Sequence, residues 1–152
     1  MRIPLPPVPL PDKVVALAAE YADGTREPVE PRNAATVIVL RGGETGPEAY
    51  YLRRQVSMDF AAGMAVFPGG GVDPRDFDAQ VGWAGPDPAA WGERLGCDEE
   101  TARALVCAAV RETFEESGVL LAGVSDGDVV ADTTADDWEA DRVALESREL
   151  AM

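Results

Sequence analysis

Residues 106–121 read VCAAVRETFEESGVLL, and they contain three glutamates within five positions. On a helix with 3.6 residues per turn, Glu112 and Glu116 stack one above the other, and Glu115 lies beside them. The apolar residues of the stretch fall on the opposite side. A helix that buries this apolar side would therefore hold three carboxylates together on the other.

Carboxylates held this close repel one another, and each raises the cost of ionising the others. A hard divalent cation removes that cost because it accepts carboxylate oxygens as ligands. The stretch therefore predicts a site for Mg2+ or Mn2+. The alternative is an acidic helix face that contacts only solvent, and the helix by itself does not exclude it.

A second segment, residues 67–73, reads FPGGGVD. Three glycines after a short apolar run let the backbone approach another group closely or adopt a positive φ angle. An ordinary glycine turn would show the same letters. Together, the glycine segment and the glutamate helix are more specific than either is alone, and they favour a loop that approaches the carboxylates.

The two segments resemble the signature of the Nudix hydrolase family, G-x5-E-x7-R-E-U-x-E-E-x-G-U, in which U is an aliphatic residue. The second half of that signature is reproduced by Arg111, Glu112, Glu115, Glu116 and Gly118. This half carries the acidic residues of the family, and so it carries most of the resemblance.

The first half of the signature is present with one exchange, because Gly70 and Asp76 reproduce G-x5-E with aspartate in place of glutamate. Two further departures are the polar Thr113 at the first aliphatic position and a spacer before Arg111 that is much longer than seven residues. The resemblance covers about residues 34–122. A long insertion at this point is similar to the coenzyme A diphosphatase-like branch of the family.

The resemblance implies an α/β (α+β) fold in which a mixed sheet lies between helices. It also implies hydrolysis of a diphosphate linkage in a nucleoside diphosphate derivative, such as coenzyme A or ADP-ribose, with Mg2+ or Mn2+ as cofactor. The implied metal ligands are Glu112, Glu115, Glu116 and the backbone carbonyl of Gly69. Relatives are often dimers, so a homodimer is one expectation.

Further roles follow from the same resemblance. Arg111 would orient the carboxylates as part of the catalytic set, and it can reach Glu115 one helical turn later. Gly70 and Gly71 would let the loop approach the substrate, and Asp76 would brace that loop. Substrate would also be held by an arginine at the end of the second strand, for which Arg54 is preferred and Arg53 is the alternative.

Two other functions stay open at this point. A Nudix-like module could bind a nucleotide without turning it over, and the exchanges at Asp76 and Thr113 are compatible with that. An acidic interaction protein that uses its charged helices is the third hypothesis, supported by net charge alone. The intact Arg-Glu and Glu-Glu pairs of the signature favour catalysis over both.

Composition limits the classes of function further. The chain has 152 residues, with 28 Asp and Glu against 13 Lys and Arg, for a net charge of −15. A nucleic-acid-binding surface needs a basic face, so that class is disfavoured. The chain has no histidine, and its two cysteines, Cys97 and Cys107, suggest no disulfide, so we expect a reducing cytoplasm. We find no run long enough to span a membrane.

The pattern along the chain predicts a proline-rich arm and a short helix over residues 1–33, with Asp12 as the helix cap, followed by a Nudix domain over residues 34–152. Within the domain we expect strands at 34–41, 48–54, 65–67 and 119–122, and the first two of these should form a hairpin. An insertion at 77–97 should contain a helix at 89–95 that Asp87 caps and Gly96 ends. The glutamate helix should run from an Asp98 cap to Gly118, and a last helix should be capped by Asp136 or Asp137 and reach about Leu150. The insertion carries Trp83 and Trp91, which either pin it to the domain or line a ligand pocket. Three aspartates at the start of the insertion, Asp73, Asp76 and Asp78, suggest either a second cation site or a turn.

Because only about thirty residues follow position 122, we expect the C-terminal part of the fold to be missing.

Overall fold

The computed structural model describes residues 9–57, 63–78, 80–125 and 127–151. The chain divides into two compact units, Met1–Pro31 and Arg32–Met152. In the first unit, helix α1 spans Asp12–Ala22, and none of its residues is buried. The expected cap at Asp12 is wrong, because Pro11 precedes the helix and Asp12 is its first residue. Residues 1–8, most of the expected proline-rich arm, lie outside the described residues.

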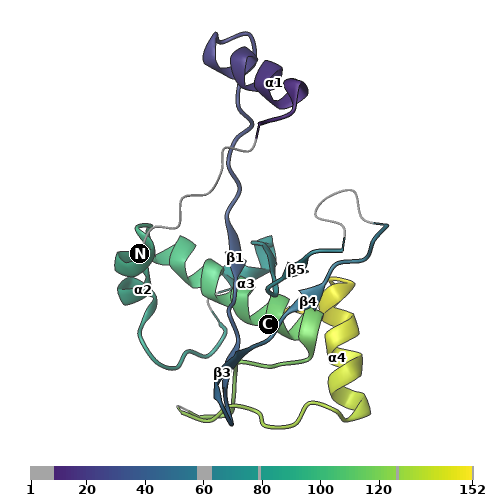
Figure 1. Ribbon diagram of the computed structural model, residues 1–152. Helices are drawn as coiled ribbons and strands as arrows, with labels where there is room; N and C mark the ends of the chain where they lie inside the picture. The colour runs from purple at the N-terminus through teal and green to yellow at the C-terminus, as the bar shows by residue number, and fades with distance from the viewer. Residues whose placement is uncertain (1–8, 58–62, 79, 126, 152) are drawn as a thin grey trace. The chain divides into compact units, whose positions relative to one another are not determined.

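The second unit is built around helix α3 (Glu99–Ser117), with α2 (Pro88–Leu95) and α4 (Asp136–Glu146) packed against it (Figure 1). The limits of α3 are those that the sequence predicts. The Asp98 side chain accepts a hydrogen bond from the Thr101 backbone N–H at 2.8 Å, and Gly118 ends the helix in the left-handed conformation with φ 72°.

The strands of this unit pair in three antiparallel couples among the described residues. The couples are β1 (Ala34–Thr36) with β6 (Gly69–Gly71), β2 (Leu40–Gly43) with β3 (Gly46–Ala49), and β4 (Leu52–Arg53) with β5 (Ala65–Val66). Backbone hydrogen bonds extend the pairing beyond the strands, from Val37 N to Pro68 O and from Tyr50 N to Val39 O. The first extended segment therefore pairs with the glycine segment at its start and forms the predicted hairpin at its end.

The mixed α/β class is confirmed, and the strands of the described residues form three two-stranded sheets in place of the single mixed sheet that was expected between helices. Every described couple is antiparallel. The predicted buried strand 34–41 is broken at residues 37–39 and covered on one side by α3. Ile38 and Leu40 of the same segment are 58% and 61% exposed, so the predicted burial of this segment is incomplete.

The chain after α3 departs furthest from expectation. The predicted strand 119–122 does not form, because Leu120 turns into a core with Phe114 and no described strand lies beside it. Helix α4 was expected to be capped by Asp136 or Asp137 and to reach Leu150. Instead it is preceded by Ala135, without a side-chain cap, and ends at Glu146.

Helix α4 is also better anchored than its few apolar residues suggest. Leu145 is buried in the same core as Phe114, and the rings of Phe114 and Trp138 meet edge to face with centroids 6.1 Å apart. Two apolar residues two turns apart, Trp138 and Leu145, thus hold α4 against the last turns of α3.

The insertion is fastened to the start of α3. Helix α2 begins with an Asp87 cap and ends at Gly96, as predicted. The Trp83 indole donates to Pro86 O, and the Arg103 guanidinium of α3 lies over its ring at 5.1 Å. Trp83 therefore has at least the pinning role, since it joins the insertion loop to α3.

No helix among the described residues has both the length and the apolar character needed to cross a bilayer.

Candidate metal and diphosphate site

Arg111 is the centre of the site. It is 4% exposed, and its guanidinium makes five hydrogen bonds. Two go to the Asp76 carboxylate (2.9 and 3.0 Å), one each to Glu112 (2.7 Å) and Glu115 (3.1 Å), and one to the Gly71 carbonyl (3.0 Å). The five N–H groups of an arginine are thereby matched by five bonds. Burial lowers the pKa of Arg111, but the hydrogen bonds to Asp76 and Glu112 raise it further, so the guanidinium stays charged.

Asp76 joins the glycine loop to α3. Besides its two bonds with Arg111, its Oδ2 accepts from the Asp73 N–H at 2.7 Å. In return, Asp73 accepts from the Arg75 N–H at 3.0 Å, which completes a capping box at the short 3-10 helix η1 (Pro74–Phe77). The Asp76 side chain is fully buried. The role that the resemblance implies for Asp76 is to brace the loop, and these bonds join the loop to α3.

The three neighbouring glycines are in unequal surroundings. A Cβ atom at Gly69 would lie 2.3 Å from the Ala35 carbonyl oxygen, and one at Gly70 would lie 2.4 Å from the Glu112 carboxylate. A Cβ atom at Gly71 would meet nothing within 4 Å. The Gly69 N–H donates to Glu116 Oε2 at 2.9 Å. Gly69 and Gly70 therefore let β6 approach the glutamates. Gly71, which with Gly70 was predicted to approach the substrate, contributes its carbonyl to Arg111.

The glutamate set contains a carboxylate oxygen that is buried without a hydrogen-bond partner. Glu115 Oε1 is buried and has no hydrogen-bond partner among the described residues. Burial raises the pKa of Glu115, and the nearby Arg111 only partly offsets that rise. A buried carboxylate oxygen without a partner is costly in a folded protein unless a cation or water meets it. Its surroundings therefore fit a hard divalent cation.

In the described part of the chain, no three acidic, histidine or cysteine side chains converge on one point as they stand. Arg111 holds one oxygen each of Glu112 and Glu115, and Gly69 holds one oxygen of Glu116. Each of the three carboxylates has a second oxygen, and all three come from two successive turns of α3. The residue types suit a hard cation, which would take those second oxygens.

The expected second cation site is not formed. Asp76 is bound by Arg111, Asp73 is bound by Arg75 at 2.9 Å, and Asp78 accepts from the Gln80 N–H at 2.8 Å. The three aspartates thus serve a capping box and a turn, which is the alternative that the sequence left open.

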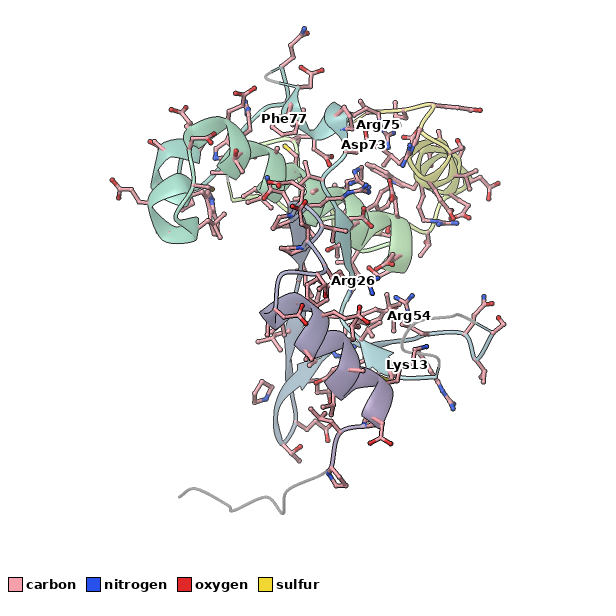
Figure 2. All side chains as sticks on the ribbon, turned by 90° about the horizontal axis from the view of Figure 1, so that it is seen from above. Lys13, Arg26, Arg54, Asp73, Arg75 and Phe77 are labelled. Carbon is pink, nitrogen blue, oxygen red and sulfur yellow. The ribbon has the colours of Figure 1, made fainter. Side chains whose placement is uncertain are left out.

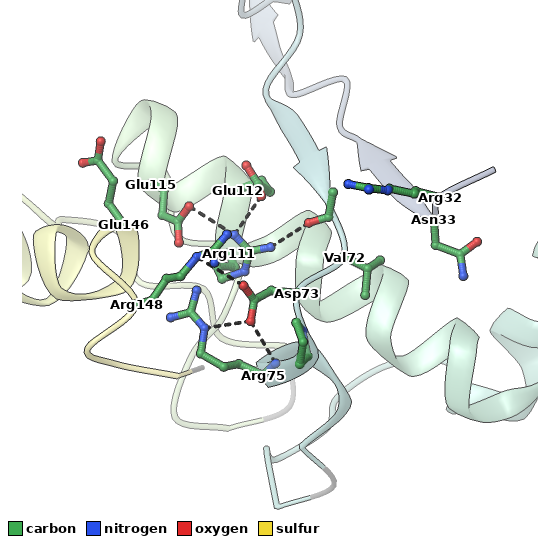
Figure 3. A pocket seen from close by; sticks show the side chains of 12 residues that line it. Arg32, Asn33, Val72, Asp73, Arg75, Arg111, Glu112, Glu115, Glu146 and Arg148 are labelled. Atoms are coloured by element: carbon green, nitrogen blue, oxygen red, sulfur yellow. Dashed lines mark hydrogen bonds and ion pairs between the residues drawn. The ribbon is translucent and has the colours of Figure 1, made fainter. Parts of the chain in front are cut away.

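A pocket of about 380 Å3 opens beside Glu112 and Glu115 (Figure 3). It is lined by Arg32, Asn33, Gly71, Val72, Asp73, Pro74, Arg75, Arg111, Glu112, Glu115, Glu146 and Arg148. Its volume is within the range of about 300–1,000 Å3 that is usual for small-molecule sites. Arg54 and Arg53, expected to hold substrate, are not in its lining, and Figure 2 shows Arg54 well apart from Asp73 and Arg75.

The sequence did not predict Arg75, which lines the pocket, or Arg142, which bonds the backbone of Glu115. Arg75 donates to Asp73 and also to the carbonyls of Leu145 and Leu150 at the end of α4. Arg142 of α4 donates to the Glu115 carbonyl at 2.8 Å. Arg75 could have been suspected because it stands between Asp73 and Asp76. Nothing in the sequence indicates that α4 returns to this site.

A second hollow, of about 660 Å3, lies on the other side of α3. Trp83 of the insertion, Val106 and Val110 of α3, and Leu121 and Val129 after it are among its lining. Both cysteines are free thiols, and Cys107, which is buried, also contributes to this lining. Burial raises the pKa of the Cys107 thiol, so it behaves as a small apolar residue here.

Comparison with solved structures finds a NUDIX hydrolase from Alicyclobacillus acidocaldarius, known from its crystal structure. The two chains are 33% identical, with a TM-score of 0.52, and the alignment covers 80% of this chain and 54% of the other. This chain thus spans about half the length of that one. No family model and no curated protein matches the chain. The likeness shows a Nudix-like fold.

Proposed function

We propose that this chain supplies the catalytic helix of a hydrolase that cleaves a diphosphate linkage in a nucleoside diphosphate derivative. Glu112, Glu115 and Glu116 would hold Mg2+ or Mn2+, with help from the Gly69 carbonyl. The observation that carries the proposal is the buried, unpartnered Glu115 Oε1 within a set of three glutamates. The likeness to a Nudix hydrolase supports the same reaction class.

A divalent cation at this position would neutralise the charge of the diphosphate and polarise its phosphorus. The protein's own contribution is to fix the carboxylates before substrate arrives. Arg111 holds one oxygen of Glu112 and one of Glu115, while the Gly69 N–H holds one of Glu116. The attacking water would give its proton to a carboxylate of this set.

Within this proposal, the substrate comes from the class of coenzyme A, ADP-ribose and related nucleoside diphosphate derivatives. The insertion at 77–97 is similar to that of the coenzyme A diphosphatase-like branch, which makes coenzyme A the first compound to test. The pocket beside Glu112 and Glu115 is where the departing half of such a substrate would lie.

The test is Mg2+-dependent release of products from a panel of these compounds, identified by mass spectrometry, together with Mg2+ binding by calorimetry. We expect Glu116→Ala to lower turnover by at least about 100-fold and to weaken Mg2+ binding, because it removes a charged ligand. Glu93→Gln, at an exposed position of α2, is the matched control and should change neither.

Unchanged turnover in Glu116→Ala would overturn the metal assignment. Mg2+-dependent binding of a compound without any product would instead favour the nucleotide-binding module. An acidic helix face that contacts only solvent would give no stoichiometric Mg2+ site in calorimetry.

A further inference from the structure

The pocket beside Glu112 and Glu115 concentrates basic residues in a chain that has few. Four of the 13 Lys and Arg residues line it, although the chain carries a net charge of −15. Two of the four are held by hydrogen bonds within the fold. Arg111 donates to the carboxylates, and Arg75 donates to Asp73 and to a carbonyl at the end of α4. The other two, Arg148 and Arg32, have few interactions with the rest of the described chain.

Arg148 occupies a backbone position that normally suits glycine. Its φ is +66°, and it is the one non-glycine residue with positive φ among those the structure describes. The N–H groups of Arg148 and Glu149 donate back to the carbonyls of Leu145 and Ala144, which is the Schellman ending of a helix. An L-residue at this position is less favourable for the backbone than glycine, so the backbone conformation gives no reason for arginine here.

The Arg148 side chain is available for a ligand. It is 76% exposed and lies 3.5 Å from Asp73, a carboxylate already bound by Arg75. An exposed pair of that length contributes little to stability, so Arg148 can leave it at small cost. Strained backbone that holds an available charged side chain at the wall of a pocket indicates a functional role.

Arg32 flanks the same pocket from another element. It stands just before β1, and Figure 3 shows it across the pocket from Arg148, with Glu112 and Arg111 between them. Among the described residues it makes no hydrogen bond or ion pair. Two cations thus line one pocket together with two of the proposed metal ligands, Glu112 and Glu115.

We propose that Arg148 and Arg32 bind the phosphate groups of the substrate, and that they position the diphosphate over Glu112 and Glu115. This inference rests on the proposed function. Guanidinium groups on two sides match the several oxygens of a diphosphate, and such charge-assisted bonds are the strong ones. Arg148 is kept at a glycine position because its contribution is to binding.

The experiment measures binding of methylenediphosphonate, a diphosphate analogue that cannot be hydrolysed, by calorimetry in excess Mg2+. We expect Arg148→Asn and Arg32→Gln each to weaken binding by about tenfold, the usual effect of losing one charge-assisted bond. Asparagine tolerates the left-handed conformation, so the turn after α4 is kept. Arg41→Gln removes an equally exposed guanidinium on β2 and should leave binding unchanged.

Arg148→Gly separates binding from folding. Glycine relieves the backbone, so thermal unfolding should move upward by about 2 °C while binding weakens as it does in Arg148→Asn. Equal affinity of the natural chain and both Arg148 variants would overturn the proposal, as would an equal loss in Arg41→Gln. Since the analogue is not hydrolysed, absence of turnover alone would count against the proposed hydrolysis and not against this anion site.

Discussion

Arg111 and Arg148 line the same pocket but stand in opposite physical situations. Arg111 is buried, and its five N–H donors meet one backbone and three side-chain partners. Arg148 is exposed, sits on unfavourable backbone, and has one long ion pair. The comparison shows that arginines at one site can have two different roles. A fully hydrogen-bonded arginine holds the site together, and a weakly paired one can bind a ligand.

The largest effect on stability should come from replacing Arg111, the buried arginine of the pair. Arg111→Ala leaves Asp76 buried without its partner and releases Glu112 and Glu115. We expect the free energy of unfolding to fall by about 3–5 kcal/mol, as is usual when one member of a buried ion pair is removed. Urea unfolding followed by circular dichroism measures this loss.

The matched control for that loss is an exposed ion pair. Arg41 bonds Glu48 at 2.7 Å but is 81% exposed, so Arg41→Ala should change the free energy of unfolding by less than about 1 kcal/mol. If Arg111→Ala and Arg41→Ala lowered the free energy of unfolding equally, the Arg111 network would not be the centre of this fold.

The glycine segment allows a sharper test, because a methyl group would meet different surroundings at three adjacent positions, of which Gly69 alone also has a positive φ, 157°. Gly69→Ala pushes against the Ala35 backbone, which cannot move without parting β1 from β6, so we expect a loss of about 1–3 kcal/mol. Gly70→Ala pushes against the end of the Glu112 side chain, which can move. It should cost less stability and weaken Mg2+ binding instead.

Gly71→Ala is the control in this series, since its Cβ would meet nothing within 4 Å. Thermal unfolding and Mg2+ calorimetry on the three variants give the two readings. A Gly70→Ala protein that binds Mg2+ as tightly as the natural chain would show that Glu112 does not need its present position.

The parts of this structure that the sequence predicts are those governed by local chemistry. Asp87 and Asp98 cap helices because an acidic side chain directly before a helix can accept from its first N–H groups. Gly96 and Gly118 end them in the left-handed conformation. The bracing of the loop by Asp76 followed from resemblance, and the geometry agrees with it.

The parts that escape prediction depend on distant contacts. Residues 119–122 have the composition of a strand, but a strand needs a partner, and Leu120 is buried against Phe114 instead. The turn at Arg148 is a further case. It depends on Leu145 entering the core and on Arg75, 73 positions earlier, bonding the end of α4. Local sequence patterns predict neither of these distant contacts.

The smallest predicted effect lies at Asp73, which pairs with Arg148 and donates its N–H to Asp76, a partner of Arg111. The hydrogen bond from the Arg75 side chain, with the Arg75 N–H and the charge of Arg148, lowers the pKa of Asp73 below its usual value near 3.8. A carboxyl whose pKa is lowered by folding stabilises the fold above its unfolded pKa, and that stabilisation is lost as the pH falls through the folded pKa. Asp73→Asn should therefore cost about 1 kcal/mol in the free energy of unfolding at pH 6, and the difference should shrink below about pH 4.

Urea unfolding of the natural chain and Asp73→Asn between pH 6 and pH 3 measures that difference, with Asp141→Asn at an exposed position of α4 as control. The same measurement in an Arg148→Asn background sharpens the comparison. Because Arg75 supplies most of the effect and Arg148 the least of the named causes, the cost of Asp73→Asn should be nearly unchanged there. If it disappeared, Arg148 would be a structural partner of Asp73, and its availability for a phosphate would have to be given up.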